Sequence, residues 1–178
     1  LKKMGASIQG EGTEEILIEG GKIIQGADMQ VPPDRIVAGT YLCAAAATRG
    51  RIEIQNPPQG ELTAFLEVYR KMGGQYEWKS GKLIANGAGI QFSVPFLETE
   101  AYPGFPTDMQ PQIGVTLALC KGTSTITESI FENRFKYLSE LARMGANVKV
   151  EGNAATIEGV DKFSGARVSA PDLRAGAA

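Results

Sequence analysis

The sequence carries an internal repeat, and this repeat limits the possible fold more than any other feature. Met-Gly pairs begin at Met4, Met72 and Met144, which lie 68 and 72 residues apart. The second and third pairs each end a stretch with apolar residues at helical spacing, and glycine ends a helix because it adopts the left-handed conformation without steric cost. The two apolar faces consist of Leu62, Phe65, Leu66, Tyr69 and Met72, and of Phe131, Phe135, Leu138, Leu141 and Met144. A period of this length exceeds that of ordinary solenoids and predicts a domain built from similar α/β units.

Each Met-Gly pair is followed by two short alternating runs on either side of a turn, which is typical of a β-hairpin. The three predicted hairpins are 7–9 with 16–19, 75–78 with 83–85, and 147–151 with 155–158. Residues 36–48 and 113–120 are apolar nearly all round, and a helix without a polar face belongs in the interior. Residues 50–54 and 122–126 add a further strand. We therefore expect an inside-out α/β barrel of repeated βαβαββ-type units, with helices inside and sheets outside.

The composition excludes several classes of function. The 178 residues include no histidine, which removes any catalytic triad or metal site that depends on an imidazole. A formal net charge of -2 lacks the basic surplus typical of proteins that grip nucleic acid or an anionic membrane, so we expect neither partner. Cys43 and Cys120 are too few and too far apart for a disulfide framework, so we interpret them as core residues in a reduced, cytoplasmic compartment. Without a phosphate-binding glycine loop or a metal-ligand set, we expect no cofactor and no metal.

Both ends of the sequence cut through a unit. Leu1 enters just before a helix-stopping glycine, Ala178 falls inside the third predicted apolar helix, and no initiator methionine is present. We therefore expect these residues to be a piece of a longer protein.

An aspartate precedes each apolar helix, at Asp34, Asp108 and Asp172. If the units are related by approximate rotation, the three carboxylates gather at one end of the domain, with Arg35 and Arg174 beside two of them. Three helix N-termini would then point the same way, and their N–H groups and positive dipole ends suit a phosphorylated or otherwise anionic ligand. Capping is the simpler interpretation for each one, because aspartate is a favoured N-cap residue.

Two further features are candidates for function. Asp108 follows a stiff loop, residues 102–107, with two prolines and a glycine, and positioned loops often carry chemistry. A polar cluster of Glu128, Glu132, Asn133 and Arg134 precedes the second amphipathic helix. This cluster is either a solvated first helical turn or a group of functional side chains.

Four motifs occur in order across essentially the whole chain. They are PDRI at 33–36 with AGT at 38–40, YPGFPTDMQ at 102–110, ITE leading to FENRF at 126–135, and DLRA at 172–175. Together they resemble the UDP-N-acetylglucosamine enolpyruvyl transferase family, which catalyses the first committed step of peptidoglycan synthesis. The resemblance implies a protein of two lobes, each with three repeated units that enclose their helices. Residues 1–30 would finish the preceding lobe, and residues 31–178 would form the second lobe, truncated within its third unit.

The same resemblance implies which residues serve the reaction, in which the enolpyruvyl group of phosphoenolpyruvate moves to the 3-hydroxyl of UDP-N-acetylglucosamine and phosphate leaves. Asp108 would contact that hydroxyl and act as general base, and the backbone at Ile130 would contact the amide group of the sugar. The charged network at the lobe interface would comprise Asp34, Glu132, Arg134, Asp172 and Arg174. The stiff loop agrees with the role of Asp108, because a carboxylate takes a proton only when it is held within hydrogen-bond reach.

Parts of the family's machinery have no counterpart in these residues. They are the Lys-Asn pair near the natural N-terminus, the mobile loop with the catalytic cysteine, and the arginines for phosphoenolpyruvate and uridine diphosphate. We therefore expect the 178 residues alone to be inactive, with the missing lobe of the same chain as their partner. Two alternatives stay open. One is the shikimate-pathway enolpyruvyl transferase, for which a Lys-Glu-Ser type motif is expected in place of FENRF, and the other is a non-catalytic α/β module that binds a sugar nucleotide.

Overall fold

The computed structural model describes residues 1–21, 25–170, 176 and 178, which belong to two compact units, Leu1–Pro32 and Pro33–Ala178. Unit 1 holds a short 3-10 helix, η1 (Lys2–Met4), and an antiparallel pair of strands, β1 (Ser7–Gln9) and β2 (Leu17–Glu19). The first predicted hairpin is therefore confirmed, with its second strand beginning at Leu17. Gly5 follows η1 with a φ of 95°, which is the left-handed conformation expected of a glycine that stops a helix.

Unit 2 contains two copies of one strand–helix–hairpin arrangement. The first copy consists of β3 (Arg51–Gln55), α2 (Thr63–Lys71), β4 (Gln75–Lys79) and β5 (Lys82–Asn86), with strand order β3-β5-β4. The second consists of β7 (Thr123–Thr127), α4 (Lys136–Arg143), β8 (Asn147–Glu151) and β9 (Ala154–Glu158), with strand order β7-β9-β8. Arg51 pairs with Asn86, and the residues 72 positions later, Thr123 and Glu158, pair in the same way. The sequence repeat is thus confirmed down to strand register.

One strand of unit 2 lies outside this shared pattern. β6 (Phe96–Glu98) pairs in parallel with β7 and extends the second sheet to the order β6-β7-β9-β8. β6 is not predicted from the sequence, because three residues are too short for an alternating pattern to stand out from a loop. Its addition places the segment that follows β6 beside the end of β7.

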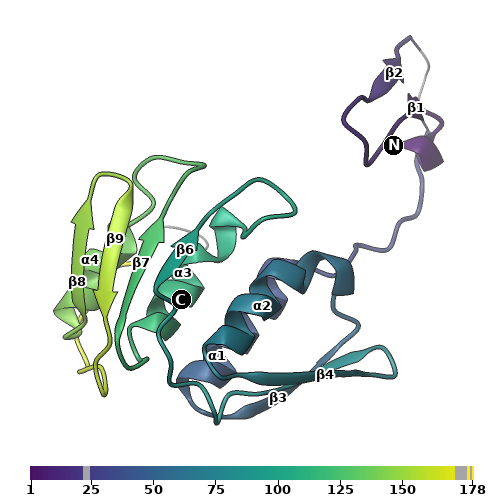
Figure 1. Cartoon of the computed structure of the whole chain (residues 1–178). Coiled ribbons are helices and arrows are strands. Elements are labelled where there is room, and N and C mark those ends of the chain that lie inside the picture. Colours follow the sequence, from purple (N-terminus) through teal and green to yellow (C-terminus); the bar gives the residue numbers. More distant parts are fainter. Residues whose placement is uncertain (22–24, 171–175, 177) are drawn as a thin grey trace. The chain divides into compact units, whose positions relative to one another are not determined.

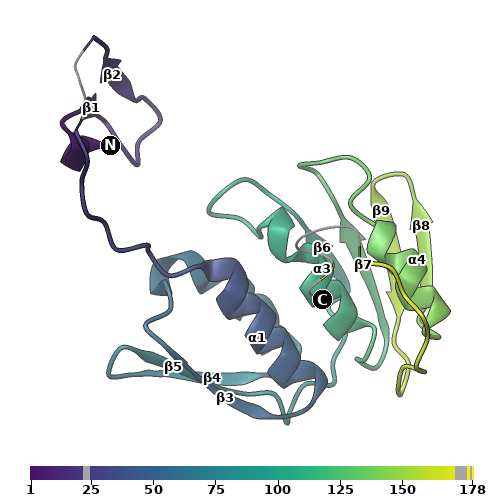
Figure 2. The ribbon, with the colours of Figure 1, turned by 180° about the vertical axis from the view of Figure 1, so that it is seen from behind.

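Two apolar helices lie on the inner side of the sheets. α1 (Arg35–Ala47) contacts β3 and β5, α3 (Gln110–Leu117) contacts β9, and the two helices pack against each other. Figures 1 and 2 show that the helices of each copy cover one face of its sheet, which turns the other face outward. A small residue also allows α1 to approach the segment just before α3, since a Cβ added to Gly39 of α1 would lie 2.9 Å from the sulfur of Met109. This is the inside-out α/β arrangement that the sequence predicts.

The hydrophobic core fills the space between these helices and sheets. Its largest fully buried side chains are Tyr69, Phe65, Leu42, Leu62, Met72, Leu83, Met109, Ile113, Leu117, Ile126, Leu138 and Ile157. Full burial of a leucine, isoleucine, phenylalanine or methionine contributes about 1.5–3 kcal/mol each relative to leaving it exposed. The apolar faces of α2 and α4, read from their helical spacing, supply several of these residues.

α1 is less enclosed than its composition predicts. Val37 and Tyr41 are 52% and 57% exposed, and Ala44 is also exposed, so the three form a stripe along one face of the helix. α3 and the first sheet cover the other sides of α1, whereas no described residue covers this one. The expectation of a fully interior helix is therefore wrong for this face of α1. It is confirmed for α3, in which every residue except Val115 is buried.

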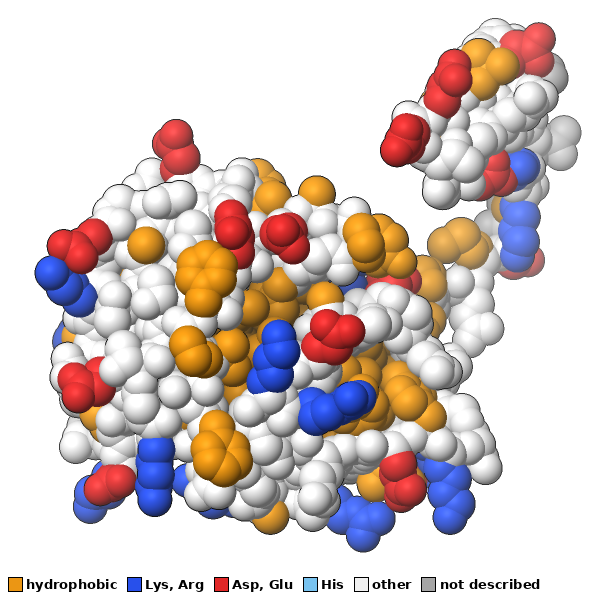
Figure 3. Space-filling model, viewed as in Figure 1, with side chains coloured by type: hydrophobic (Ala, Val, Ile, Leu, Met, Phe, Trp, Pro, Cys, Tyr) orange, Lys and Arg blue, Asp and Glu red, His pale blue; other side chains and the backbone are white. Residues whose placement is uncertain are grey.

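The surface of unit 2 mixes charge and apolar area. The face in Figure 3 carries acidic and basic side chains interspersed, with apolar side chains between them. Phe92, Phe96 and Tyr102 are each more than half exposed. Within the part of the chain that the structure describes, no helix is both long enough and apolar enough to cross a membrane.

Candidate functional site

Asp34 acts as the N-cap of α1. Its Oδ1 accepts hydrogen bonds from the backbone N–H groups of Ile36, at 2.6 Å, and Val37, at 3.4 Å. These donors have no partner within the helix, so the side chain stabilises its first turn. The capping interpretation is confirmed for this aspartate. Two other members of the predicted charged network, Asp172 and Arg174, lie outside the described residues.

Asp108 has a different place from Asp34 in the repeat. It lies inside a 3-10 helix, η3 (Thr107–Met109), and no side chain caps η3 or the helix α3 that follows. The offset of 72 residues places Pro106 at the position of Asp34, so Asp108 stands beyond the capping position. The capping interpretation is therefore wrong for Asp108. The sequence misled because the two aspartates look alike until the strand register aligns the copies.

An ion pair holds the Asp108 carboxylate instead. Its Oδ1 accepts a hydrogen bond from Nη2 of Arg134 at 3.0 Å, and the two side chains are 24% and 19% exposed. A hydrogen bond between ionised groups is stronger than a neutral one, and partial burial limits its screening by water. The structure thus brings together two of the site residues predicted from the sequence, on a carboxylate that solvent still reaches.

Arg134 belongs to the loop between β7 and α4. The sequence predicts a helix from residue 131, but α4 begins at Lys136, and Asn133 has a φ of 58° that no right-handed helix accommodates. The Arg134 guanidinium lies 4.9 Å from the centroid of the Phe131 ring, a cation–π contact. In this loop conformation Arg134 contacts both the Phe131 ring and the Asp108 carboxylate. Glu132, the remaining member of the predicted charged network, is exposed in this loop.

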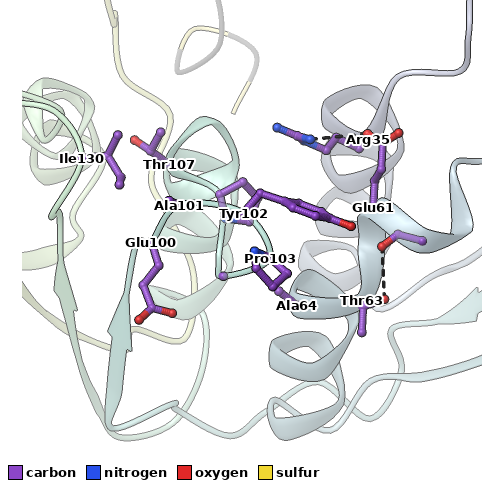
Figure 4. A pocket seen from close by; sticks show the side chains of 13 residues that line it. Arg35, Glu61, Thr63, Ala64, Glu100, Ala101, Tyr102, Pro103, Thr107 and Ile130 are labelled. Carbon is purple, nitrogen blue, oxygen red and sulfur yellow. Dashed lines mark hydrogen bonds and ion pairs between the residues drawn. The ribbon is translucent and has the colours of Figure 1, made fainter. Parts of the chain in front are cut away.

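A pocket of about 400 Å³ lies at the same end of unit 2 (Figure 4). Its walls include Arg35, Glu61, Tyr102, Thr107 and Ile130. Arg35 Nη1 lies 3.4 Å from Glu61 Oε2, and Figure 4 shows the Tyr102 side chain extending across the pocket from its loop.

This pocket relates the predicted site residues to one another. Arg35 directly follows Asp34, Thr107 directly precedes Asp108, and Ile130 is itself part of the wall. Of the predicted site residues, Ile130 therefore lines this pocket, whereas Asp34 and Asp108 are adjacent in sequence to residues that line it.

Glu128 belongs to the polar cluster predicted from the sequence, but its burial and its contacts were not predicted. It is only 3% exposed, whereas its companions in the polar cluster, Glu132 and Asn133, are exposed. Its carboxyl group accepts hydrogen bonds from the hydroxyls of Thr99 and Thr107. Both threonines lie more than twenty residues away in sequence, so only the sheet pairing of β6 with β7 could reveal the contact.

Both cysteines lie in the core, as the sequence predicts. Burial raises the pKa of the Cys43 thiol to about 12 and that of Cys120 to about 11, because an apolar environment disfavours the thiolate. Neither is placed to act as a nucleophile near neutral pH. Among the described residues, no group of three or more acidic or cysteine side chains is arranged to hold a metal ion.

The fold and this site define a class of protein. The sequence profile of EPSP synthase (3-phosphoshikimate 1-carboxyvinyltransferase) matches residues 1–178. The chain therefore belongs to the EPSP synthase family.

Several curated relatives are named UDP-N-acetylglucosamine 1-carboxyvinyltransferase. The chain is 48% identical over 178 residues to UDP-N-acetylglucosamine 1-carboxyvinyltransferase 2 of Caldanaerobacter subterraneus subsp. tengcongensis, covering 100% of this chain and 43% of that protein. It is 46% identical over 177 residues to the UDP-N-acetylglucosamine 1-carboxyvinyltransferase of Shewanella piezotolerans, covering 99% of this chain and 42% of that protein. The chain thus spans less than half the length of these relatives.

Solved structures support the fold. The enolpyruvyl transferase NikO from Streptomyces tendae matches with a TM-score of 0.78 and 23% identity, over 99% of this chain and 42% of that one. EPSP synthase from Acinetobacter baumannii matches with a TM-score of 0.67 and 19% identity, over 99% of this chain and 44% of that one. At these identities the likeness concerns the arrangement of helices and strands alone.

Proposed function

We propose that these residues form part of a UDP-N-acetylglucosamine 1-carboxyvinyltransferase. The enzyme transfers the enolpyruvyl group of phosphoenolpyruvate to the 3-hydroxyl of UDP-N-acetylglucosamine and releases phosphate. The observation that carries the proposal is Asp108, a partly exposed carboxylate that is held by Arg134 and directly follows Thr107, in the wall of a pocket that also includes Ile130. The 48% identity to a protein of that name supports the choice of acceptor.

Asp108 acts as the general base in this proposal. The oxygen of the sugar 3-hydroxyl bonds to C2 of phosphoenolpyruvate, and its proton passes to the carboxylate. In the same step C3 takes a proton from a general acid of the missing lobe. The C2–O bond to phosphate then breaks and C3 loses a proton, which restores the carbon–carbon double bond. A positioned carboxylate contributes to such a step by taking the proton as the new bond forms.

Ile130 contacts the sugar through its backbone. Its N–H donates to Glu128 Oε1 at 3.1 Å, so the backbone group that it offers a ligand is the carbonyl oxygen. A carbonyl accepts hydrogen bonds only, and the acetamido group of the sugar supplies an N–H. This match supports the assignment of Ile130 to the amide group of the sugar.

The remaining charged residues serve the interface with the other lobe of the enzyme. Residues 31–178 belong to the second lobe, and residues 1–30 finish the preceding one. The network at the interface comprises Asp34, Glu132, Arg134, Asp172 and Arg174. The missing lobe supplies the groups that bind phosphoenolpyruvate and the diphosphate, and the reaction takes place in the cytoplasm as a step of peptidoglycan synthesis, on which cell shape and division depend.

The choice of acceptor tests this function. The full-length protein that contains these residues is assayed for phosphate release from phosphoenolpyruvate, with UDP-N-acetylglucosamine or shikimate 3-phosphate as acceptor. We expect phosphate release when UDP-N-acetylglucosamine is the acceptor and none when shikimate 3-phosphate is the acceptor. Release with shikimate 3-phosphate alone would assign the shikimate-pathway reaction, and binding of the sugar nucleotide without release would support a non-catalytic module.

A further inference from the structure

We propose that Glu128 is a positioning residue that holds the general base and the sugar-binding backbone in a fixed relation to each other. The inference rests on the proposed function of Asp108 and Ile130, and it assigns a role to a residue that contacts neither substrate. Its basis is the hydrogen bonding of one buried carboxyl group to its own loop and to two threonines that lie 29 and 21 residues earlier in the chain.

The four hydrogen bonds of Glu128 use both of its oxygens. Oε1 accepts from the Thr99 hydroxyl at 2.9 Å, from the N–H of Ile130 at 3.1 Å and from the N–H of Phe131 at 3.2 Å. Oε2 accepts from the Thr107 hydroxyl at 2.9 Å. The carboxyl group therefore joins the segment after β6, the helix η3 and the loop after β7. Thr107 adjoins the proposed base, and Ile130 is the proposed sugar contact.

This arrangement is costly to disturb. A buried carboxyl group is tolerated when donors occupy its oxygens, and Glu128 accepts three hydrogen bonds at Oε1 and one at Oε2. Replacing Glu128 by alanine would leave the buried hydroxyls of Thr99 and Thr107 and two partly buried N–H groups of the loop after β7 without their acceptor. The loops would move to satisfy them, and a displacement of about 1 Å at a reacting group can cost about 100-fold in rate.

The other copy of the internal repeat has no glutamate at the equivalent position. The residue equivalent to Glu128, 72 positions earlier, is Asn56. The N–H of Asn56 donates to Gly81 at 3.0 Å, and the N–H of Glu128 donates to Asn153 at 2.8 Å, so both residues bond to the same position of the neighbouring hairpin. The backbones differ there, because Asn56 has a φ of 49° and Glu128 has no positive φ. Asn56 is exposed, whereas Glu128 is 3% exposed. The buried carboxyl group is therefore a feature of the copy that carries Asp108.

We call the hydrogen bonds accepted by Oε1 and the one accepted by Oε2 the two arms of Glu128. Loss of each arm should have a different kinetic effect. The Oε2 arm reaches Thr107 and through it the base, so its loss should lower kcat. The Oε1 arm fixes Ile130, so its loss should raise the KM for the sugar nucleotide. Neither arm reaches the phosphoenolpyruvate groups, which the missing lobe supplies, so the KM for phosphoenolpyruvate should stay unchanged.

The test compares four variants of the full-length protein. Glu128→Ala removes both arms, Glu128→Gln retains the shape and one acceptor oxygen, and Thr107→Val cuts only the arm toward Asp108. Glu67→Gln, at an exposed position of α2, is the matched control. Steady-state kinetics are measured against both substrates, and amide hydrogen exchange is followed at Ile130 and Phe131.

We expect Glu128→Ala to lower kcat/KM for UDP-N-acetylglucosamine by about 10- to 100-fold, with the KM for phosphoenolpyruvate as in the wild type. Glu128→Gln should restore most of this loss, and Thr107→Val should lower kcat alone. The amides of Ile130 and Phe131 should exchange faster in Glu128→Ala, while those of β7 stay protected.

Wild-type kinetics in Glu128→Ala, or equal changes in the KM of both substrates, would overturn the positioning role. If Glu128→Ala does not fold, wild-type kinetics in both Glu128→Gln and Thr107→Val would do the same. A wild-type enzyme without turnover contradicts the proposed function instead, and the exchange rates then still report whether Glu128 fixes this loop.

Discussion

The guanidinium of Arg134 donates a hydrogen bond from Nη2 to Oδ1 of Asp108 over 3.0 Å. This contact joins the loop after β7 to η3, two segments that belong to different parts of the repeat. The Phe131 ring supports the same guanidinium from 4.9 Å. The orientation of the Asp108 carboxylate therefore depends on a residue 26 positions farther along the chain.

Replacement of Arg134 by alanine should destabilise the chain and slow the enzyme. The ion pair is about four-fifths buried, so its loss should lower the free energy of unfolding by about 1–2 kcal/mol, between the values for exposed and buried pairs. In the full-length protein, kcat should fall by about 10-fold as Asp108 loses its fixed orientation. The matched control is Arg143→Ala, which removes an exposed arginine paired with Glu140 and should change stability by less than about 0.5 kcal/mol. Equal effects of the two substitutions in chemical denaturation would contradict this account.

Substitutions of Gly114 and Tyr137 should have non-additive effects on the free energy of unfolding, because the two residues are in contact. A Cβ on Gly114 would lie 2.1 Å from the Tyr137 hydroxyl oxygen, so Gly114→Ala should cost about 1–3 kcal/mol through overpacking. That hydroxyl has no hydrogen-bond partner among the described residues, so Tyr137→Phe alone should change little.

The double variant should recover part of the loss, because it removes the closest atom of the clash. The control is Gly165→Ala, at a glycine with no atom within 4 Å of the added Cβ. Thermal and urea unfolding measure all four variants, and strictly additive effects of Gly114→Ala and Tyr137→Phe would exclude the contact.

The buried thiols make stability sensitive to alkaline pH. Burial raises the pKa of the Cys43 thiol from its ordinary 9.0 to about 12, so the folded chain holds this proton more tightly than the unfolded chain does. The stabilisation is complete below pH 9 and is lost as the pH rises toward 12, with a slope of about 1.4 kcal/mol per pH unit. Cys120, with a pKa of about 11, adds a loss of the same sign.

Cys43→Ala should therefore show a shallower fall of the free energy of unfolding above pH 9 than the wild type. Urea unfolding at a series of pH values measures this slope independently of any constant cost of the substitution. Identical slopes for the variant and the wild type would mean that Cys43 titrates normally in the folded chain.

The 178 residues alone should release no phosphate from phosphoenolpyruvate and UDP-N-acetylglucosamine. They should also bind the sugar nucleotide weakly or not at all, because most of the proposed site lies in the other lobe and too few contacts remain to offset the entropy of association. Calorimetry and a phosphate assay measure the two properties. Submillimolar binding without turnover would favour the non-catalytic binding module.

The elements of the fold that are long and periodic could be predicted from the sequence. The α2 and α4 faces, the hairpins and the apolar α3 all follow from spacing and from glycines such as Gly73 and Gly145, whose φ values of 101° and 94° match the predicted helix stops. β6 was missed because its three residues gain their stability from pairing with β7, a contact that local pattern does not encode. The start of α4 was placed too early because Asn133 adopts a left-handed conformation that its helix-like spacing conceals.

The sequence predicted which residues belong to the site better than it predicted the contacts that they make. Asp34 caps its helix as its residue type suggests, but Asp108 was given the same interpretation, and only the strand register separates the two. The pairing of Asp108 with Arg134 and the burial of Glu128 depend on segments that meet through the sheet. Such contacts are set by tertiary packing rather than by local sequence.

The most direct test of this account is the rate of phosphate release by the full-length protein when Asp108 is replaced by asparagine. Asp108→Asn keeps the size and most of the polarity of the side chain but removes the carboxylate that takes the proton. With UDP-N-acetylglucosamine and phosphoenolpyruvate as substrates, we expect kcat to fall by at least about 100-fold, with the KM for the sugar nucleotide little changed. Turnover within about twofold of the wild type would contradict the assignment of Asp108 as the base.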